Sequence, residues 1–193
     1  ACRLALHRTQ RPPAYYAGTN SVLPQVSVWS RMTDPASQQN HRLPASVDPA
    51  TVVRGDFGPH DHPILGSPDR APEWLGFHVS EYGDGYARAH MQVRADMLNG
   101  FQIAHGGMIF AFADTCFAWA CNNPDGDGSV VTVTQGADVN FLSSPEEGAR
   151  LTAVGVRHSS TGRSGLCDVT VTDEQDRVVL EFRGRFRTVT RSA

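Results

Sequence analysis

The chain has 193 residues, of which 17 are basic and 20 are acidic, and its formal net charge is −3. Hydrophobic residues make up 40% and charged residues 19%, the composition of an ordinary soluble globular protein with one domain or two. All the basic residues are Arg. Because acidic residues outnumber them, no overall positive field would draw the chain to nucleic acid or to an anionic membrane, and we expect neither partner.

The distribution of apolar residues and cysteines favours a cytoplasmic protein. The longest apolar stretch, residues 108–121, is interrupted by Asp114 and is shorter than the roughly 20 residues that a membrane-spanning helix needs. The four cysteines form no CxxC pair, no zinc-binding pattern and no dense disulfide framework, and no secretory signal pattern precedes them. We therefore expect reduced thiols, a cytoplasmic location and a buried helix over residues 108–121.

The first 72 residues differ in composition from the rest. They contain ten of the twelve prolines and show no sustained hydrophobic period. They hold 7 Arg against 5 acidic residues, whereas residues 73–193 hold 10 Arg against 15. We predict a Pro-rich, disordered N-terminal extension over residues 1–72 and one folded domain over residues 73–193. The first methionine is Met32, and we hypothesise that residues 1–31 are not native.

The extension contains one group of residues that a metal ion could use, His60-Asp61-His62. Stable metal sites in proteins need three or four ligands, and no further candidate ligand lies nearby in this Pro-rich stretch. We therefore expect these side chains to be exposed to solvent and to hold no metal.

From residue 73 onward the hydrophobic pattern predicts one helix and six strands. Residues 75–79 and 86–93 alternate as two strands joined by a turn, and Gly106-Gly107 begin a helix that is apolar on nearly all sides and ends at Asn122. Four further strands are predicted, at residues 130–142, 149–159, 165–172 and 178–190.

One helix that is apolar around its circumference, in a chain otherwise composed of strands, predicts an α+β fold. An antiparallel β-sheet would wrap around this one long central helix. Such a single layer leaves one edge of the sheet and one flank of the helix uncovered. We therefore expect the chain to pair with further copies of itself, as a homodimer or a homotetramer.

Asp114 is the most informative residue of the predicted helix. A carboxylate in this apolar run must be desolvated, which is costly unless the carboxylate is paired or hydrogen-bonded. Groups perturbed in this way gather at active sites, where a carboxylate can accept a proton. The alternative is a structural Asp that accepts hydrogen bonds at a subunit interface.

His105-Gly106-Gly107 stand where the predicted helix begins, and its first N–H groups have no partner within the helix. Glycines there would let a carbonyl oxygen approach these N–H groups, as in an oxyanion hole; the alternative is a simple loop-to-helix turn. Eight residues at 1.5 Å each place Asp114 about 12 Å from Gly106 along the helix axis. If both residues act in one site, they come from two chains, as antiparallel helices of a twofold dimer would allow.

The residues around this helix resemble those of hotdog-fold acyl-CoA thioesterases of the phenylacetic-acid-degradation (PaaI) type. The motif is Met-Leu-Asn-Gly-Phe-Gln-Ile-Ala-His-Gly-Gly at residues 97–107, followed by Ala-Asp-Thr at 113–115 and Ala-Trp-Ala-Cys-Asn at 118–122. Further similarity at residues 140–142, 161–165 and 180–184 extends the resemblance over most of residues 73–189. Residues 1–72 are not covered.

The resemblance implies hydrolysis of an acyl-CoA thioester, with an aryl or medium-chain acyl group such as phenylacetyl, to free acid and CoA. It implies no metal and no redox cofactor. The amide of Gly106 would polarise the carbonyl, while Asp114 of the partner chain activates water or attacks directly; both routes stay open. The alternatives are a hotdog-fold acyl-thioester hydratase or dehydratase, which needs a catalytic His that the helix lacks, and a non-catalytic acyl-CoA-binding regulatory module.

Five further residues receive roles from the resemblance. Asn99 and His105 would orient the thioester or the helix start, and Thr115 would hold the water; their structural alternatives are a turn, a helix cap and an ordinary helix residue. Gly107 and Phe101 would contact the substrate. Phe101 replaces a His that is often found there, which makes the acyl pocket more apolar.

Arginines are the expected ligands for the phosphates of CoA. Arg163 lies in a predicted turn, and Arg183, Arg185 and Arg187 alternate on the last strand and therefore share one face. Guanidinium groups there would bind phosphates in bidentate fashion, and the alternative is a solvated outer face.

Overall fold

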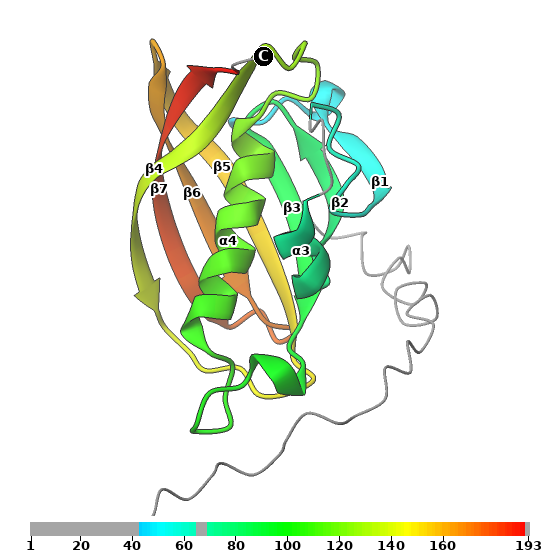
Figure 1. Ribbon diagram of the computed structural model, residues 1–193, viewed down its shortest axis with the longest axis vertical. Helices are drawn as coiled ribbons and strands as arrows, with labels where there is room; N and C mark the ends of the chain where they lie inside the picture. The colour runs from blue at the N-terminus through cyan, green and yellow to red at the C-terminus, as the bar shows by residue number, and fades with distance from the viewer. Residues whose placement is uncertain (1–42, 65–68, 192–193) are drawn as a thin grey trace, which may run out of the picture. The chain divides into compact units, whose positions relative to one another are not determined.

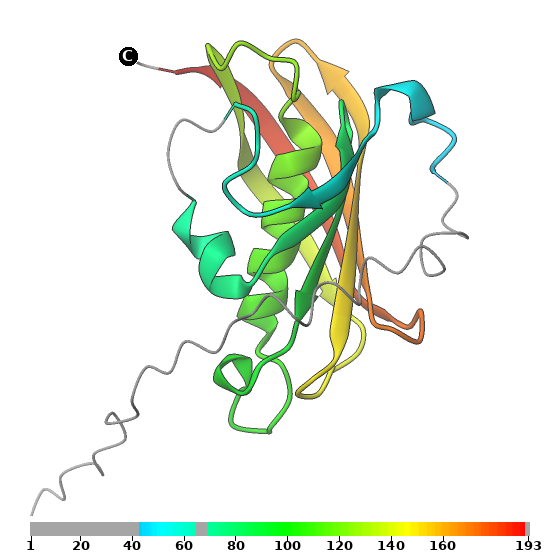
Figure 2. The ribbon, with the colours of Figure 1, turned by 90° about the vertical axis from the view of Figure 1, so that its right-hand side faces the viewer.

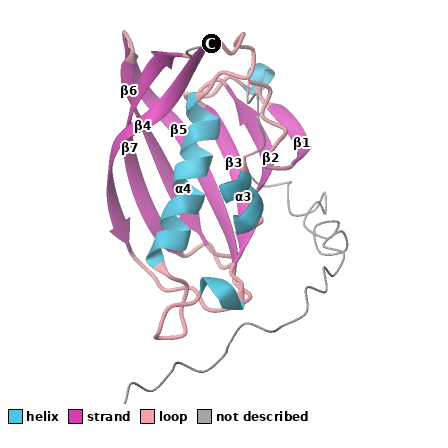
Figure 3. Cartoon of the chain, viewed as in Figure 1, coloured by secondary structure: helices cyan, strands magenta, loops and turns pink. Residues whose placement is uncertain are grey.

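The computed structural model describes residues 43–64 and 69–191. In these residues seven antiparallel strands form one sheet in the order β1-β2-β3-β5-β6-β7-β4, and the long helix α4 lies against one face (Figures 1 and 3). The strands are β1 (Val53–Phe57), β2 (His78–Gly83), β3 (Tyr86–Gln92), β4 (Val130–Phe141), β5 (Arg150–Thr161), β6 (Ser164–Thr172) and β7 (Val178–Thr190). The helices are α3 (Arg70–Leu75) and α4 (Gly106–Cys121), with 3-10 turns at Pro49–Thr51 and Ala95–Met97.

The sheet wraps around α4, as the view turned by 90° shows (Figure 2). Helix α4 directs Phe112, Cys116 and Phe117 into the core, where all three are fully buried. The predicted α+β architecture, an antiparallel sheet around one long helix, is confirmed. None of the helices in the described residues has the length and apolarity to cross a bilayer.

The folded unit begins well before residue 73, so the predicted domain boundary is wrong. Strand β1 pairs with β2, with Val53 opposite Tyr82, and it forms one edge of the sheet. Leu75, predicted to begin a strand, is instead the buried last residue of α3, because Gly76 adopts φ 69° and caps the helix. Residues 1–31, which we hypothesised to be non-native, lie outside the described residues.

Two glycines set the distance between α4 and the sheet. At Gly184 of β7, an added Cβ would lie 2.2 Å from the ring of Phe117. At Gly155 of β5, it would lie 3.1 Å from Cβ of Ala120. The helix therefore packs directly on the backbone of two strands, where a larger side chain would push it away.

We predict that Gly184→Ala lowers the free energy of unfolding by about 1–3 kcal/mol, because the new methyl group overpacks the contact with Phe117. Gly100→Ala is the matched control, since no atom lies within 4 Å of its added Cβ. Urea unfolding of both variants and the wild type measures the difference. Unchanged stability of Gly184→Ala would show that α4 can shift without cost.

A second prediction concerns His90 of β3, whose ring lies between the hydroxyls of Ser80 (2.9 Å) and Thr152 (3.2 Å). Burial, with smaller contributions from the positive Arg88 and from His78, lowers the pKa of His90 from 6.5 to about 3. Between these values the unfolded chain binds a proton at this position and the folded chain does not. Stability is therefore complete above pH 6.5 and is lost as the pH falls.

We expect the wild type to lose about 1–2 kcal/mol of unfolding free energy between pH 7 and pH 5 through this one group. In His90→Gln that part of the loss disappears, so its stability is flatter with pH. Urea unfolding at both pH values is the measurement. Parallel pH profiles for the two proteins would contradict the assignment.

Candidate active site

One side of α4 is left uncovered by the sheet. The residues on this side recur at helical spacing and are half-buried or exposed: Gly107, Phe110, Ala111, Asp114, Thr115 and Ala118. The single chain thus leaves one flank of the helix uncovered, as the sequence predicts for one layer of sheet. The physical reason is that one curved sheet contacts only the opposite side of the helix.

Asp114 lies in the middle of this uncovered stripe. It is half-buried rather than fully desolvated, and its Oδ1 accepts a 2.7 Å hydrogen bond from the hydroxyl of Thr134 on β4. Among the described residues, no group donates a hydrogen bond to Oδ2. One carboxylate oxygen is thus anchored, and the other is available to a substrate or a water molecule.

The start of α4 offers a free backbone donor. Nδ1 of His105 caps the helix by accepting the N–H of Gly107 at 3.0 Å, and the carbonyl of His105 accepts the N–H of Met108 at 2.9 Å. The N–H of Gly106 makes no hydrogen bond within the described residues. The ring of Phe141 lies beside Gly106, so close that an added Cβ would be 3.0 Å from it. Gly106 therefore presents its N–H next to an aromatic wall.

The loop before the helix is a compact turn. Oδ1 of Asn99 accepts the N–H of Phe101 at 2.8 Å, and Gln102 adopts φ 62°. Phe101 is 86% exposed at the tip of this loop. Asn99 thus stabilises a turn and His105 caps the helix, which are the structural alternatives to their catalytic roles. Within the described residues, Nδ2 of Asn99 and Nε2 of His105 make no hydrogen bond.

Thr115 makes the hydrogen bond that is typical of an ordinary threonine within a helix. Its hydroxyl donates a 2.9 Å hydrogen bond to the carbonyl of Ala111, one turn earlier in α4. The hydroxyl oxygen can still accept a hydrogen bond, and Thr115 is half-buried on the uncovered side of the helix, next to Asp114 in the chain.

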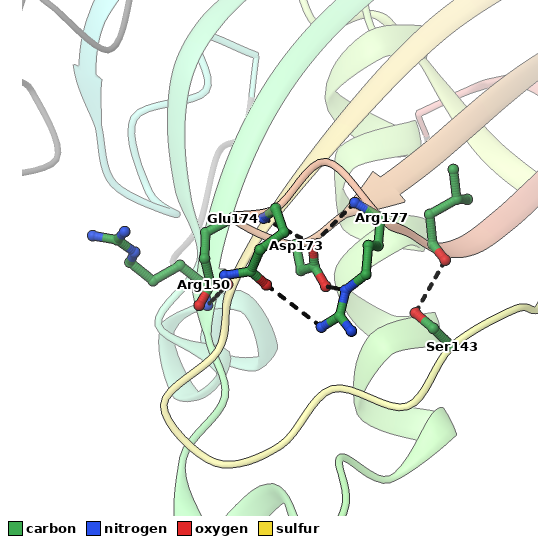
Figure 4. Close-up of polar contacts among 7 residues, drawn as sticks. Ser143, Arg150, Asp173, Glu174 and Arg177 are labelled. Carbon is green, nitrogen blue, oxygen red and sulfur yellow. Dashed lines mark hydrogen bonds and ion pairs between the residues drawn. The ribbon is translucent and has the colours of Figure 1, made fainter.

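Hydrogen bonds at the end of the sheet hold the helix start in place (Figure 4). Asp173, in the turn between β6 and β7, accepts the N–H of Arg177 at 3.0 Å and pairs with its guanidinium at 2.7 Å. Glu174 accepts the N–H of Arg150, and Ser143 donates to the carbonyl of Val178 at 3.0 Å. The segment after β4 is thereby fixed, and its Pro145 carbonyl accepts the N–H of Ala104, two residues before α4.

The arginines expected at phosphates lie apart from Gly106. Arg183 is bound in bidentate fashion by Asp168, at 2.7 and 2.5 Å, and Arg185 is bound by Asp138 at 2.5 Å. Arg163 is exposed, and its carbonyl accepts the N–H of Thr188. The hydroxyls of Thr188 and Thr132 are hydrogen-bonded, and the N–H of Thr132 donates to Asn122, which follows the last turn of α4. Arg163 therefore lies toward the C-terminal end of α4, whereas Gly106 lies at its N-terminal end.

A hollow of about 240 Å³ opens beside Asp114, between α3 and the second half of α4. Its walls include Asp114, Ala118, Trp119 and Asn122 of α4 and its cap, with His62 and Pro72 from the upstream segment. The expected solvent exposure of His62 is wrong: the residue is 4% exposed, and its ring lies 4.6 Å from the ring of Trp119 in a T-shaped contact. Sequence alone could not show this, because a large aromatic partner 57 residues away causes the burial.

Comparison with known proteins agrees with this arrangement. Residues 101–180 match the thioesterase superfamily. The acyl-coenzyme A thioesterase PaaI of Escherichia coli K12 is 36% identical over 118 residues, which are 61% of this chain and 81% of that protein. A putative esterase of Mycobacterium tuberculosis is 35% identical over 118 residues, or 58% of this chain and 80% of that protein.

Solved structures show the same fold. The E. coli PaaI structure aligns with a TM-score of 0.58 at 33% identity, covering 63% of this chain and 85% of that chain. The TT0310 protein of Thermus thermophilus aligns with a TM-score of 0.57 at 30% identity, covering 63% and 98%. Both the predicted hotdog fold and the predicted thioester hydrolase are confirmed. This chain therefore belongs to the thioesterase superfamily, as a hotdog-fold thioesterase of the PaaI type.

Proposed function

We propose that this protein hydrolyses the thioester of an aryl or medium-chain acyl-CoA, with phenylacetyl-CoA as the type, to free acid and CoA. The observation that carries the proposal is the half-buried carboxylate of Asp114, anchored on one oxygen by Thr134 and bordered by a hollow on the uncovered side of α4. The name of the E. coli relative supports an acyl-CoA substrate. We propose no metal and no cofactor apart from the CoA of the substrate.

The complete site is proposed to need two chains. Gly106 and Asp114 lie on one rigid helix about 12 Å apart, too far for one carbonyl group to contact both. Antiparallel helices of a twofold dimer would bring Gly106 of one chain beside Asp114 of the other, which gives two equal sites. Exposed apolar side chains on and next to the free edge strand β4 support such pairing: Val130, Val133, Phe141 and Leu142.

The proposed reaction begins with the thioester oxygen at the N–H of Gly106. This N–H stabilises the negative charge that develops when water attacks the carbonyl carbon, while the carboxylate of Asp114 accepts a proton from that water. The tetrahedral intermediate collapses, the C–S bond breaks with its electron pair on sulfur, and the proton passes from Asp114 to the CoA thiolate. The products are a carboxylic acid and CoA, and Asp114 is again ionised.

Other predicted residues are proposed to assist. The hydroxyl of Thr115 accepts a hydrogen bond from the attacking water, and Asn99 and His105 orient the thioester with the polar atoms that their loop contacts leave free. Gly107 lets the substrate approach the helix start. Phe101 lends an apolar wall to the partner's site, and Arg163 is proposed to contact a CoA phosphate there.

We predict that Asp114→Asn lowers kcat on phenylacetyl-CoA by about 10²–10⁴-fold, because the amide cannot accept the proton from water. Thr134→Val should lower kcat by about tenfold, since it removes the hydrogen bond by which the Thr134 hydroxyl orients the carboxylate. Thiol release from a panel of acyl-CoAs measures both. Near wild-type rates in Asp114→Asn would remove this residue from the mechanism, and no thiol release by the wild type with any acyl-CoA would refute the proposed function.

The helix start permits a sharp test of Gly106. His105 has φ −66° and ψ 128°, a conformation that accepts a following proline, and proline is well tolerated at the first position of a helix. Gly106→Pro removes the N–H and adds ring carbons, and Gly106→Ala, which keeps the N–H, controls for the contact of the new Cβ with Phe141. We expect kcat to fall by about 10²–10³-fold in the Pro variant and much less in the Ala variant.

Mixing the two inactive variants tests the shared site. When Asp114→Asn and Gly106→Pro chains are unfolded together and refolded, half of the dimers are mixed, and each mixed dimer contains one intact site. Activity should therefore recover to about a quarter of the wild-type value. Recovery of none would show that both residues act within one chain.

A further inference from the structure

The short helix α3 borders the uncovered flank of α4 and reaches the candidate site. Ala71 and Pro72 of α3, with Asp69 just before it, line the hollow that opens beside Asp114. Any part of a substrate that lies next to this carboxylate is therefore bounded on one side by α3. The position of α3 thus determines how wide the hollow is.

Helix α3 is too short to hold its place by itself. It has six residues, and isolated helices of fewer than about 12–15 residues are marginal in water. Pro72 and Leu75 are its buried residues, whereas Trp74 is 50% exposed. Contacts with other parts of the chain must therefore fix the position of this helix.

The guanidinium of Arg94, which follows β3, caps the C-terminal end of α3. It donates hydrogen bonds to the carbonyls of Leu75 at 2.9 Å and of Trp74 at 2.8 Å. The two carbonyls before these accept the N–H groups of Gly76 at 3.1 Å and of Phe77 at 2.9 Å. All four carbonyls that the end of a helix leaves without partners are thus satisfied, two of them by Arg94.

Arg94 also adjoins the segment that leads to α4. It stands directly before the 3-10 turn Ala95–Met97, and its guanidinium pairs with Asp96 at 3.1 Å. The carbonyl of Met97 accepts the N–H of His105 at 2.8 Å, and His105 caps α4. One side chain therefore ties the end of α3 to the segment that begins α4.

The bonds to the carbonyls contribute more to this tie than the ion pair does. The side chains of Arg94 and Asp96 are 31% and 55% exposed, and ion pairs at such sites contribute little. The guanidinium carbon also lies 5.1 Å from the centre of the Trp74 ring, a cation–π contact. A lysine ammonium lacks the planar fork that reaches two carbonyls at once, so the arrangement is specific for arginine.

We propose that Arg94 is a positioning residue for thioester hydrolysis: by capping α3, it holds this helix as the wall of the site beside Asp114. This inference rests on the proposed function, because it takes the surroundings of Asp114 as the place where the substrate binds. Arg94 acts through α3 and not on the reacting atoms. A wall of this kind contacts the substrate equally before and during the reaction, so its displacement raises KM and leaves kcat nearly unchanged.

Arg94→Met tests this role, because methionine keeps an apolar stem and removes every donor. We expect KM for phenylacetyl-CoA to rise by about five- to tenfold, with kcat changed by less than about twofold. Arg94→Lys should recover part of the loss. Equal KM values in Arg94→Met and the wild type would overturn the role, and so would a lower kcat at an unchanged KM.

Arg70→Met is the matched control on the same helix. Arg70 is exposed, and in the part of the chain that the structure describes its guanidinium makes no hydrogen bond or ion pair. Arg70→Met should therefore match the wild type in KM and in kcat. A rise in KM as large as that of Arg94→Met would show that any loss of positive charge near α3 weakens binding, and would overturn the role of the cap.

Hydrogen exchange separates a local effect on α3 from a general loss of stability. Peptides that cover residues 70–77 should exchange faster in Arg94→Met than in Arg70→Met, because the last turn of α3 has lost its cap. Peptides from β7 should exchange alike in the two variants. Faster exchange in β7 as well would show that Arg94 stabilises the whole fold, and would overturn a specific role at α3.

Binding measurements distinguish the failure of this inference from the failure of the proposed function. In an Asp114→Asn background, calorimetry gives the Kd of phenylacetyl-CoA without turnover. A Kd raised by Arg94→Met about as much as KM is expected to rise supports the role of Arg94, even if the wild type releases no thiol. Thiol release by the wild type, with KM and Kd unchanged by Arg94→Met, overturns that role and leaves the proposed function intact. No binding by any variant would overturn both.

Discussion

A long apolar helix must be covered on every side, and the sheet of this protein covers only one side of α4. The other sides of α4 are either covered by the upstream segment or left open. The upstream segment packs α3 and His62 over one flank, near Trp119. The flank that carries Asp114 stays open in the single chain, and the proposed dimer would cover it. The limited cover that the sheet provides thus accounts for the packing of the upstream segment on α4 and for the proposed dimer.

The ion pairs of the sheet lie on the face turned away from Asp114. The outer face of the sheet pairs Arg183 with Asp168 and Arg185 with Asp138, and the carboxylates of these pairs hold the guanidinium groups in place. On the other face, Asp114 accepts a hydrogen bond from a neutral hydroxyl rather than from an arginine. Its charge is therefore oriented without being neutralised, which a group that accepts a proton from water requires.

The sequence predicted the helix and the six strands that follow residue 73 because each has a strong hydrophobic period. It also identified Gly106 and Asp114 as candidate site residues, because a glycine pair at a helix start and a lone carboxylate in an apolar helix are unusual. It could not predict β1 or the burial of His62, whose environments depend on Tyr82 and Trp119, far away in the chain. The role of Thr134 was missed for the same reason, since the sequence of a strand does not show whether its threonine faces solvent or a carboxylate 20 residues away.

The two edges of the sheet differ in a way that bears on how copies of this chain assemble. Strand β1 is five residues long, carries Arg54 and Asp56, and has an irregular register against β2, features that discourage another strand from adding there. Strand β4, at the other edge, is twelve residues long and apolar along part of its length. With β1 blunted and β4 open, strand pairing between copies through β4 would end at two chains, because the sheet of the described residues offers no second open edge on which fibres could grow.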